Sequence, residues 1–191
     1  MQLKFSTDWF TDKIPNFEVC MKAIEGSHKT FLEIGVFEGR ATCWLLKHGL
    51  DDNGEIYCVD PFVGVKGFSI EDDLYGVFKS NTEKAKHSLQ QVITYRTLSR
   101  HALAEFIYDM HTKFSFIYVD GAHDARNALT DMCMSWELLN KGGVMLVDDY
   151  EWHHANTEQE KPKLAVDCFL EVYKGKYELL FKNYQVGIKK L

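Results

Sequence analysis

The chain has 191 residues, 46% of them hydrophobic, which is enough for one compact domain with a sizeable core and tight for two. Its formal net charge is −6, from 22 Lys and Arg against 28 Asp and Glu, and basic residues form no run, so a nucleic acid partner is not expected. The amino terminus lacks the apolar core of a signal peptide, and no apolar run reaches the roughly 18 residues of a membrane span, which predicts a soluble, cytoplasmic protein without a membrane partner.

The number and spacing of the cysteines also favour the cytoplasm. Five are scattered along the chain, an odd number without any CxxC pair, and this favours reduced thiols over a disulfide framework. We expect all of them to be small core residues. They are Cys20, Cys43, Cys58, Cys133 and Cys168.

Residues 1–29 precede the first predicted strand and carry the aromatic side chains Trp9, Phe10 and Phe17. Two interpretations of this segment stay open. It could fold over a bound ligand as a cap or lid, or its aromatic residues could pack a terminal helix onto the sheet.

The stretch FLEIGVFEGRA, residues 31–41, is typical of a strand, a tight turn and the start of a helix. In an α/β protein such a turn binds nucleotide-like ligands. Phe37 occupies the position where a dinucleotide fold needs its middle glycine, so a pyrophosphate is disfavoured. Gly35 and Gly39 still permit a turn with exposed amides at a helix start, which suits a carboxylate such as the methionine end of S-adenosylmethionine.

Asp60 ends the next predicted strand, EIYCV, and lies 25 residues beyond Gly35. An acid at this place can accept hydrogen bonds from both ribose hydroxyls of a cofactor, and its charge would repel the 2′-phosphate of NADP. The plainer alternative is that the glycines only permit the turn and that Asp60 caps the following segment.

The rest of the chain alternates strands and helices without a linker or an internal repeat. Residues 61–90 indicate only a loop and one or two helices. Further short strands are predicted at QVITY, FSFIYV and GVMLV, and apolar residues at helical spacing over 125–139 predict a helix that NKGG stops. The pattern predicts a single α/β domain with a buried parallel sheet.

Another helix is expected from Pro162, a residue that suits the first turn. Its predicted apolar stripe consists of Leu164, Ala165, Cys168, Phe169 and Val172. After it, YELLF and YQVGIKK are predicted to form an antiparallel hairpin that closes the sheet.

Acidic residues follow two of the predicted strands: Asp120, with His123 three residues on, and the pair Asp148 and Asp149. Because the carboxyl ends of parallel strands share one edge, three carboxylates are expected in one cleft. Like charges this close either raise a pKa or hold a cation, and oxygen ligands suit a hard divalent ion, magnesium first, with manganese or calcium as alternatives. Without a metal, Asp148 would cap a loop, Asp149 would face solvent and Asp120 would bind the cofactor's amine.

From about residue 30 to the end, the sequence resembles the class I S-adenosylmethionine-dependent methyltransferases. The resemblance rests on the glycine turn after the first strand, the acid after the second, TLSRHAL after the third and the terminal hairpin. It implies a Rossmann-like, doubly wound seven-stranded sheet with an antiparallel last strand, in one domain (1–191) made of a cap segment (1–29) and a catalytic core (30–191). The cofactor residues it implies are Glu33, Gly35, Gly39 and Thr42 for the methionine part, Asp60 for the ribose, Ser99 for the adenine edge, and Asp120.

The acidic residues and His123 that follow the fourth and fifth strands resemble the pattern of the metal-dependent O-methyltransferase branch. This branch includes catechol, caffeoyl-CoA and macrolide-sugar O-methyltransferases. These proteins carry D-x-x-K or D-x-x-H after strand four and D-D or D-N after strand five. The resemblance implies a metal held by Asp120, Asp148 and Asp149 and a general base at His123. Histidine where phenol-methylating members usually have lysine favours a sugar or glycoside as acceptor.

Three other functions stay open: a catechol-type phenol O-methyltransferase, a metal-free methyltransferase acting on nitrogen, and a non-catalytic protein that only binds the cofactor. The sequence leaves the oligomeric state open.

Overall fold

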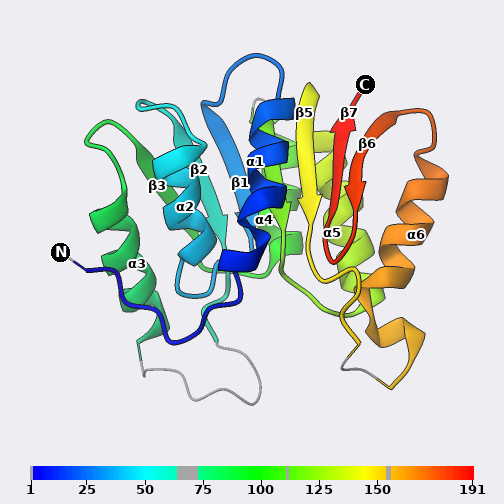
Figure 1. Cartoon of the computed structure of the whole chain (residues 1–191), viewed down its shortest axis with the longest axis horizontal. Helices are drawn as coiled ribbons and strands as arrows, with labels where there is room; N and C mark the ends of the chain where they lie inside the picture. Colours follow the sequence, from blue (N-terminus) through cyan, green and yellow to red (C-terminus); the bar gives the residue numbers. More distant parts are fainter. Residues whose placement is uncertain (1, 64–72, 111, 154–155) are drawn as a thin grey trace.

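The computed structural model describes residues 2–63, 73–110, 112–153 and 156–191, and within them the chain forms a seven-stranded sheet flanked by helices (Figure 1). The strands are β1 (Thr30–Ile34), β2 (Glu55–Val59), β3 (Gln91–Tyr95), β4 (Phe114–Val119), β5 (Leu139–Val147), β6 (Tyr177–Lys182) and β7 (Val186–Lys190). The helices are α1 (Ile14–Ala23), α2 (Arg40–His48), α3 (Leu74–Ala85), α4 (Ser99–Asp109), α5 (Ala125–Leu138) and α6 (Pro162–Val172), with short 3-10 turns η1 (Thr11–Lys13) and η2 (Glu158–Glu160).

The strand order is β3-β2-β1-β4-β5-β7-β6. The first five strands pair in parallel, and β7 pairs antiparallel with both β5 and β6. This confirms the doubly wound sheet and the closing hairpin. The order reverses between β1 and β4, and the crevice at the carboxyl ends of these neighbouring strands is where such folds bind ligands.

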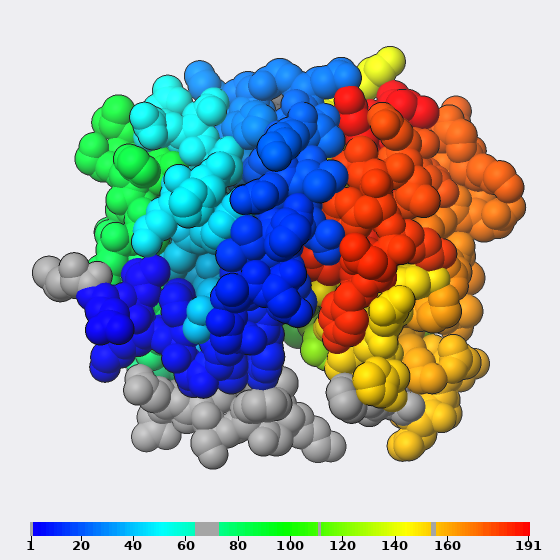
Figure 2. All heavy atoms as spheres, in the orientation of Figure 1, coloured from blue at the N-terminus to red at the C-terminus, as the bar shows by residue number. Residues whose placement is uncertain are grey.

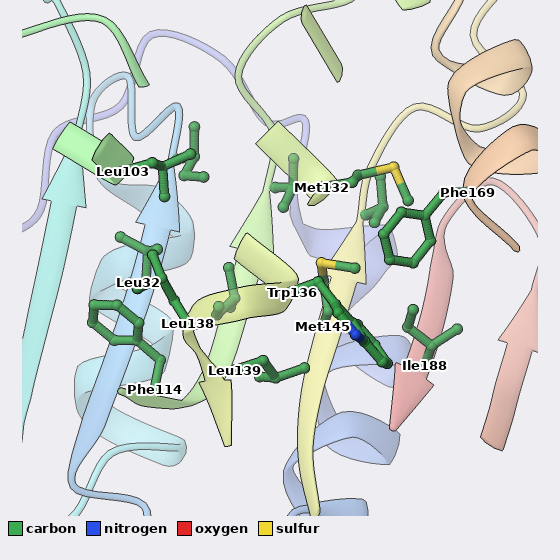
Figure 3. Packing of buried hydrophobic residues seen from close by; sticks show 14 of the residues in the cluster. Leu32, Leu103, Phe114, Met132, Trp136, Leu138, Leu139, Met145, Phe169 and Ile188 are labelled. Atoms are coloured by element: carbon green, nitrogen blue, oxygen red, sulfur yellow. The ribbon is translucent and has the colours of Figure 1, made fainter. Parts of the chain in front are cut away.

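Helices cover both faces of the sheet because its central strands are apolar on both sides. Side chains of α1, α2 and α3 pack on one face, among them Phe17, Leu45 and Phe78. The opposite face carries α4, α5 and α6, and Figure 3 shows part of that core. Its members there include Leu103, Met132, Trp136 and Phe169 from the helices and Leu32, Phe114, Met145 and Ile188 from the strands.

NKGG does not separate helix from strand as predicted. Helix α5 ends at Leu138, and β5 begins at the next residue, Leu139, whose extended backbone already pairs with Phe114. The four residues then lie inside β5 as an irregularity in its register with β4, and Gly142 takes a left-handed φ of 76° there. The Lys190 ammonium donates to the carbonyls of Trp136 and Leu139, which fixes this junction.

Two expectations about burial are confirmed only in part. Cys20, Cys43 and Cys58 are core residues, but Cys133 is only half-buried and Cys168 is exposed. Helix α6 does begin at Pro162, and its predicted stripe is right in part, since Ala165 and Phe169 are buried. The helix also buries Val166 and Leu170, while the predicted Val172 is 79% exposed. The buried face therefore lies on the Val166 side of the predicted stripe, because successive residues differ by about 100° around a helix.

Helix α3 lies within the poorly predicted stretch 61–90, of which residues 64–72 fall outside the described ranges. Within those ranges, no helix is both long and apolar enough to cross a membrane.

Candidate cofactor and metal site

The glycine turn after β1 is shaped by contacts that exclude larger residues. Gly35 has a φ of 81°, and a Cβ there would lie 2.0 Å from the main-chain oxygen of Asp120. Gly39, the residue before α2, has a φ of 79°, and a Cβ would lie 2.8 Å from the Phe78 ring. The turn therefore packs directly against the end of β4, which brings both predicted halves of the site together.

Asp60, at the end of β2, holds this turn in place. One carboxylate oxygen accepts hydrogen bonds from the N–H groups of Val36 (2.9 Å) and Phe37 (3.0 Å), and the other accepts one from the N–H group of Phe62 (2.6 Å). A carboxylate has about four acceptor positions, so capacity for a ribose hydroxyl remains. The predicted ribose acid thus also organises the backbone of the turn.

Glu33, in β1, is buried behind the turn. The Thr42 hydroxyl donates to its carboxylate over 2.7 Å. Burial raises the pKa of Glu33 to about 8, with the negative charge of Asp60 adding to the effect and the Thr42 hydrogen bond opposing it. At neutral pH this group is mostly protonated, and so it can donate a hydrogen bond as well as accept one.

A pocket lies beside the turn, lined by Glu33, Gly35 and Asp120 from the sheet edge and by Trp9 and Phe10 from the N-terminal segment. The Trp9 and Phe37 ring centroids are 5.4 Å apart. Figure 2 shows the dark-blue N-terminal segment lying across the lower part of this face. Phe17 of α1 is fully buried against the sheet, so the aromatic residues do pack a helix there, and Trp9 and Phe10 line the pocket. A lid that folds over a bound ligand stays a prediction.

Ser99 lies apart from this pocket. It is the first residue of α4 and neighbours the carboxylate of Asp131. Burial raises the pKa of Asp131 to about 6, and a hydrogen bond from Ser99 opposes the shift. The same acid lies next to Gly121, the residue after Asp120.

The three predicted carboxylates and His123 line one hollow at the ends of β4 and β5, as expected, but their hydrogen-bond partners differ. Ligand atoms of Asp120, His123 and Asp149 lie within 4.8 Å of one another, and His123 Nε2 is 3.0 Å from an Asp149 oxygen. Asp148 has other partners: its Oδ2 accepts hydrogen bonds from the Lys13 ammonium (2.6 Å) and the Tyr118 hydroxyl, and its Oδ1 accepts the N–H of Asp149 (2.7 Å). The structure thus brings His123 close to two of the predicted carboxylates.

The electrostatics of this edge reflect crowded negative charge. Burial, together with the charges of Asp148 and Asp149, raises the pKa of Asp120 well above its usual range. The hydrogen bond to Asp149 raises the pKa of His123, although burial opposes it. A cation among Asp120, His123 and Asp149 would offset the repulsion, so the donor set fits a divalent metal. The carboxylate oxygens of Asp120 and Asp149 suit Mg²⁺ or Mn²⁺, and Mn²⁺ would also accept the imidazole as a third ligand if His123 turned away from Asp149.

Sequence reasoning missed Lys13 and Tyr118. Tyr118 lies in β4, where the apolar pattern indicated a core residue, and its buried hydroxyl reaches both Asp120 and Asp148. Lys13 meets Asp148 across 135 positions of sequence, and no local pattern signals that contact.

Residues 32–150 match the family model described as a methyltransferase domain. The match runs from β1 through Asp149, so it includes the glycine turn, Asp60 and both acidic strand ends. No curated protein sequence matches the chain.

Solved structures share the fold at low sequence identity. An O-methyltransferase from Bacillus cereus in complex with SAH is 18% identical with a TM-score of 0.65, covering 98% of this chain and 84% of that one. An rRNA methylase from Streptococcus thermophilus is 11% identical with a TM-score of 0.62, covering 93% and 95%. MycE, a methyltransferase from the mycinamycin biosynthetic pathway in complex with Mg, SAH and mycinamycin VI, is 13% identical with a TM-score of 0.62, covering 96% and 50%.

Proposed function

The chain belongs to the methyltransferase-domain family and has the class I S-adenosylmethionine-dependent methyltransferase fold, and from this we propose a metal-dependent transfer of methyl to a hydroxyl group of a small molecule. The observation that carries the proposal is the convergence of Asp120, His123 and Asp149 beside the glycine turn. A sulfonium methyl is already activated, so the protein has to align an acceptor oxygen and remove its proton.

The residues that the methyltransferase resemblance implies are assigned to the cofactor, and some of them line the pocket beside the glycine turn. Glu33, Gly35, Gly39 and Thr42 would surround the methionine part, Asp60 would accept from the ribose and Ser99 would face the adenine edge. The pocket lining supports Glu33, Gly35 and Asp120, since all three face one cavity. Protonated Glu33 would offer a hydrogen-bond donor to the methionine carboxylate, and the Asp60 side chain would offer acceptor oxygens to the ribose hydroxyls.

The metal is assigned to the carboxylates of Asp120 and Asp149, and the general base to His123. When bound, a divalent ion makes a coordinated hydroxyl more acidic and fixes its position. Asp149 holds His123 Nε2, which orients the ring and leaves Nδ1 to accept the proton of the acceptor.

His123→Ala tests the base. We expect turnover to fall by roughly 10² to 10⁴, the usual contribution of a general base, while affinity for SAH and Mn²⁺ is kept. Loss of Mn²⁺ binding together with turnover would instead make His123 a metal ligand, and full turnover would remove it from the mechanism. Calorimetry with each ligand separates these results.

We propose a sugar or glycoside as the acceptor. The histidine at position 123 and the net charge of −6 support an uncharged aliphatic hydroxyl over a polyanion such as RNA. A panel of glycosides, catechols and small carboxylates, assayed with Mg²⁺, with Mn²⁺ and with a chelator, tests the class. Turnover of catechols alone would overturn the sugar assignment, full activity in chelator would overturn the metal, and cofactor binding without turnover of any acceptor would indicate a binding protein.

A further inference from the structure

The N-terminal segment, residues 4–13, is attached to the cofactor turn at one end. The Lys4 main chain exchanges hydrogen bonds with the Asn81 side chain of α3, at 2.9 Å and 2.6 Å. The Ser6 N–H donates to the Glu38 carboxylate (2.7 Å), and the Arg40 guanidinium donates to the Thr7 carbonyl (2.7 Å). Glu38 and Arg40 belong to the turn and the start of α2, so these bonds fix the segment over the cofactor half of the site.

The other end of the segment is attached to the metal half. Lys13 places its ammonium 2.6 Å from Asp148, with the Lys13 side chain 14% exposed and that of Asp148 fully buried. The ammonium also lies 5.4 Å from the Tyr184 ring centroid, in the turn between β6 and β7. Between the two attachments, Trp9 and Phe10 line the pocket.

The partners of Asp148 explain why it stands outside the metal group. Both of its oxygens are engaged, one by Lys13 and Tyr118 and the other by the main chain of Asp149. A divalent ion would have to displace a buried ammonium to use this carboxylate. The Tyr118 hydroxyl also donates to Asp120, over 3.0 Å, so the lysine makes the difference. An oxygen of Asp120 and an oxygen of Asp149 lie within 4.8 Å of each other and of a His123 nitrogen, where an ion could bind both carboxylates without displacing Lys13.

We propose that Lys13 is a positioning residue that reserves Asp148 for the N-terminal segment, so that Asp148 clamps this segment over the cofactor pocket and the metal is left to Asp120 and Asp149. The statement about the metal rests on the proposed function, whereas the clamp does not. Because the ammonium and the metal are both cations beside one acidic edge, each weakens the binding of the other, and this coupling is reciprocal.

Hydrogen exchange of the apo protein tests the clamp without any metal. We expect Lys13→Met and Asp148→Asn each to speed exchange of the Lys4 and Ser6 amides by about tenfold or more, since their bonds to Asn81 and Glu38 form only while the segment is docked. Lys13→Arg should restore much of the protection. Lys22→Met, on an exposed position of α1, is the matched control and should leave exchange unchanged. Unchanged exchange in both Lys13→Met and Asp148→Asn would overturn the clamp.

Calorimetry with Mn²⁺ tests the division of the carboxylates. Asp149→Ala should lose Mn²⁺ binding, Asp148→Ala should keep it within about threefold, and Lys13→Met should tighten it severalfold because a nearby positive charge is gone. Loss of Mn²⁺ binding in Asp148→Ala as complete as in Asp149→Ala would overturn the assignment. If the unaltered protein binds no Mn²⁺, the metal in the proposed function is wrong, and the exchange experiment still decides the clamp.

Discussion

At the scale of single residues, Asp60 joins the shape of the cofactor turn to the chemistry of ribose recognition. Asp60→Asn removes the charge and one acceptor oxygen, and charged hydrogen bonds contribute roughly 1.5 to 3 kcal/mol each. We therefore expect the dissociation constant for SAH to rise by about 10- to 100-fold, measured by calorimetry. Asp52→Asn is the control, because that side chain is 84% exposed. Unchanged affinity, or tighter binding of NAD, would contradict the assignment.

The raised pKa of Glu33 predicts that the stability of the protein depends on pH. Its pKa is about 8 in the folded protein against an ordinary 4.5, so between these values the folded state keeps a proton that the unfolded state has lost. The free energy of unfolding therefore falls as pH rises through this window, at up to roughly 1.4 kcal/mol per unit. Glu33→Gln should remove this loss, raising the melting temperature by about 4 °C or more at pH 8 and little near pH 4.5.

Asp131 supplies the comparison for that experiment. Its pKa is raised from 3.8 to about 6, so the gain in Asp131→Asn should be complete soon above pH 6, whereas that of Glu33→Gln should still grow up to pH 8. Thermal melting at a series of pH values measures both profiles. If the two variants had identical profiles, burial of Glu33 would not be the cause of the pH-dependent stability.

At the scale of elements, the turn between β1 and α2 tolerates no side chain at its first glycine. Gly35→Ala adds a Cβ 2.0 Å from the main-chain oxygen of Asp120, which would push β1 and β4 apart, and we expect a loss of about 3 kcal/mol or more. Gly26 has a similar φ of 87° with nothing within 4 Å, so Gly26→Ala should cost only the roughly 1 to 2 kcal/mol of the left-handed conformation. Equal losses in urea unfolding would contradict the clash.

The elements themselves could be predicted wherever local chemistry decides them. β1, β2, β3 and β4 follow from short apolar runs, and α6 from Pro162. The junction of α5 and β5 could not be predicted, because a lysine from β7 fixes it across more than 50 residues. The face of α6 was predicted only in part, with Ala165 and Phe169 right, because apolar residues such as Leu164 and Val172 also occupy its solvent side.

In the candidate site, too, the residues placed by local structure could be predicted, whereas the long-range contacts could not. Glu33, Gly35 and Asp120 were predictable because their positions follow from strand ends and a turn, and the structure gathers them around one pocket. The partner of Asp148 was not, because an ion pair between residues 13 and 148 depends on the folded path of the whole chain. His123 was proposed as a base, and its hydrogen bond to Asp149 became visible only in three dimensions.

At the scale of the whole molecule, α1 connects the N-terminal segment to the sheet through an aromatic cluster. The fully buried Phe17 ring lies 4.9 Å from those of Phe10 and Tyr118 and 5.6 Å from that of Trp44. Phe17→Ala should lower the free energy of unfolding by about 3 to 5 kcal/mol. Val19→Ala, on the same helix but 44% exposed, should change it by less than about 1 kcal/mol. Similar losses in urea denaturation would mean that α1 does not depend on this cluster.

The contacts of α1 also set an order of events during synthesis. The Asn16 amide donates to Asn183 and Gln185, in the turn between β6 and β7. Residue 185 is synthesised 169 positions after residue 16, so this end of the molecule cannot close until β6 and the turn that follows it have emerged from the ribosome. Nascent chains halted before residue 183 should therefore leave α1 incompletely docked and its apolar side open to chaperones.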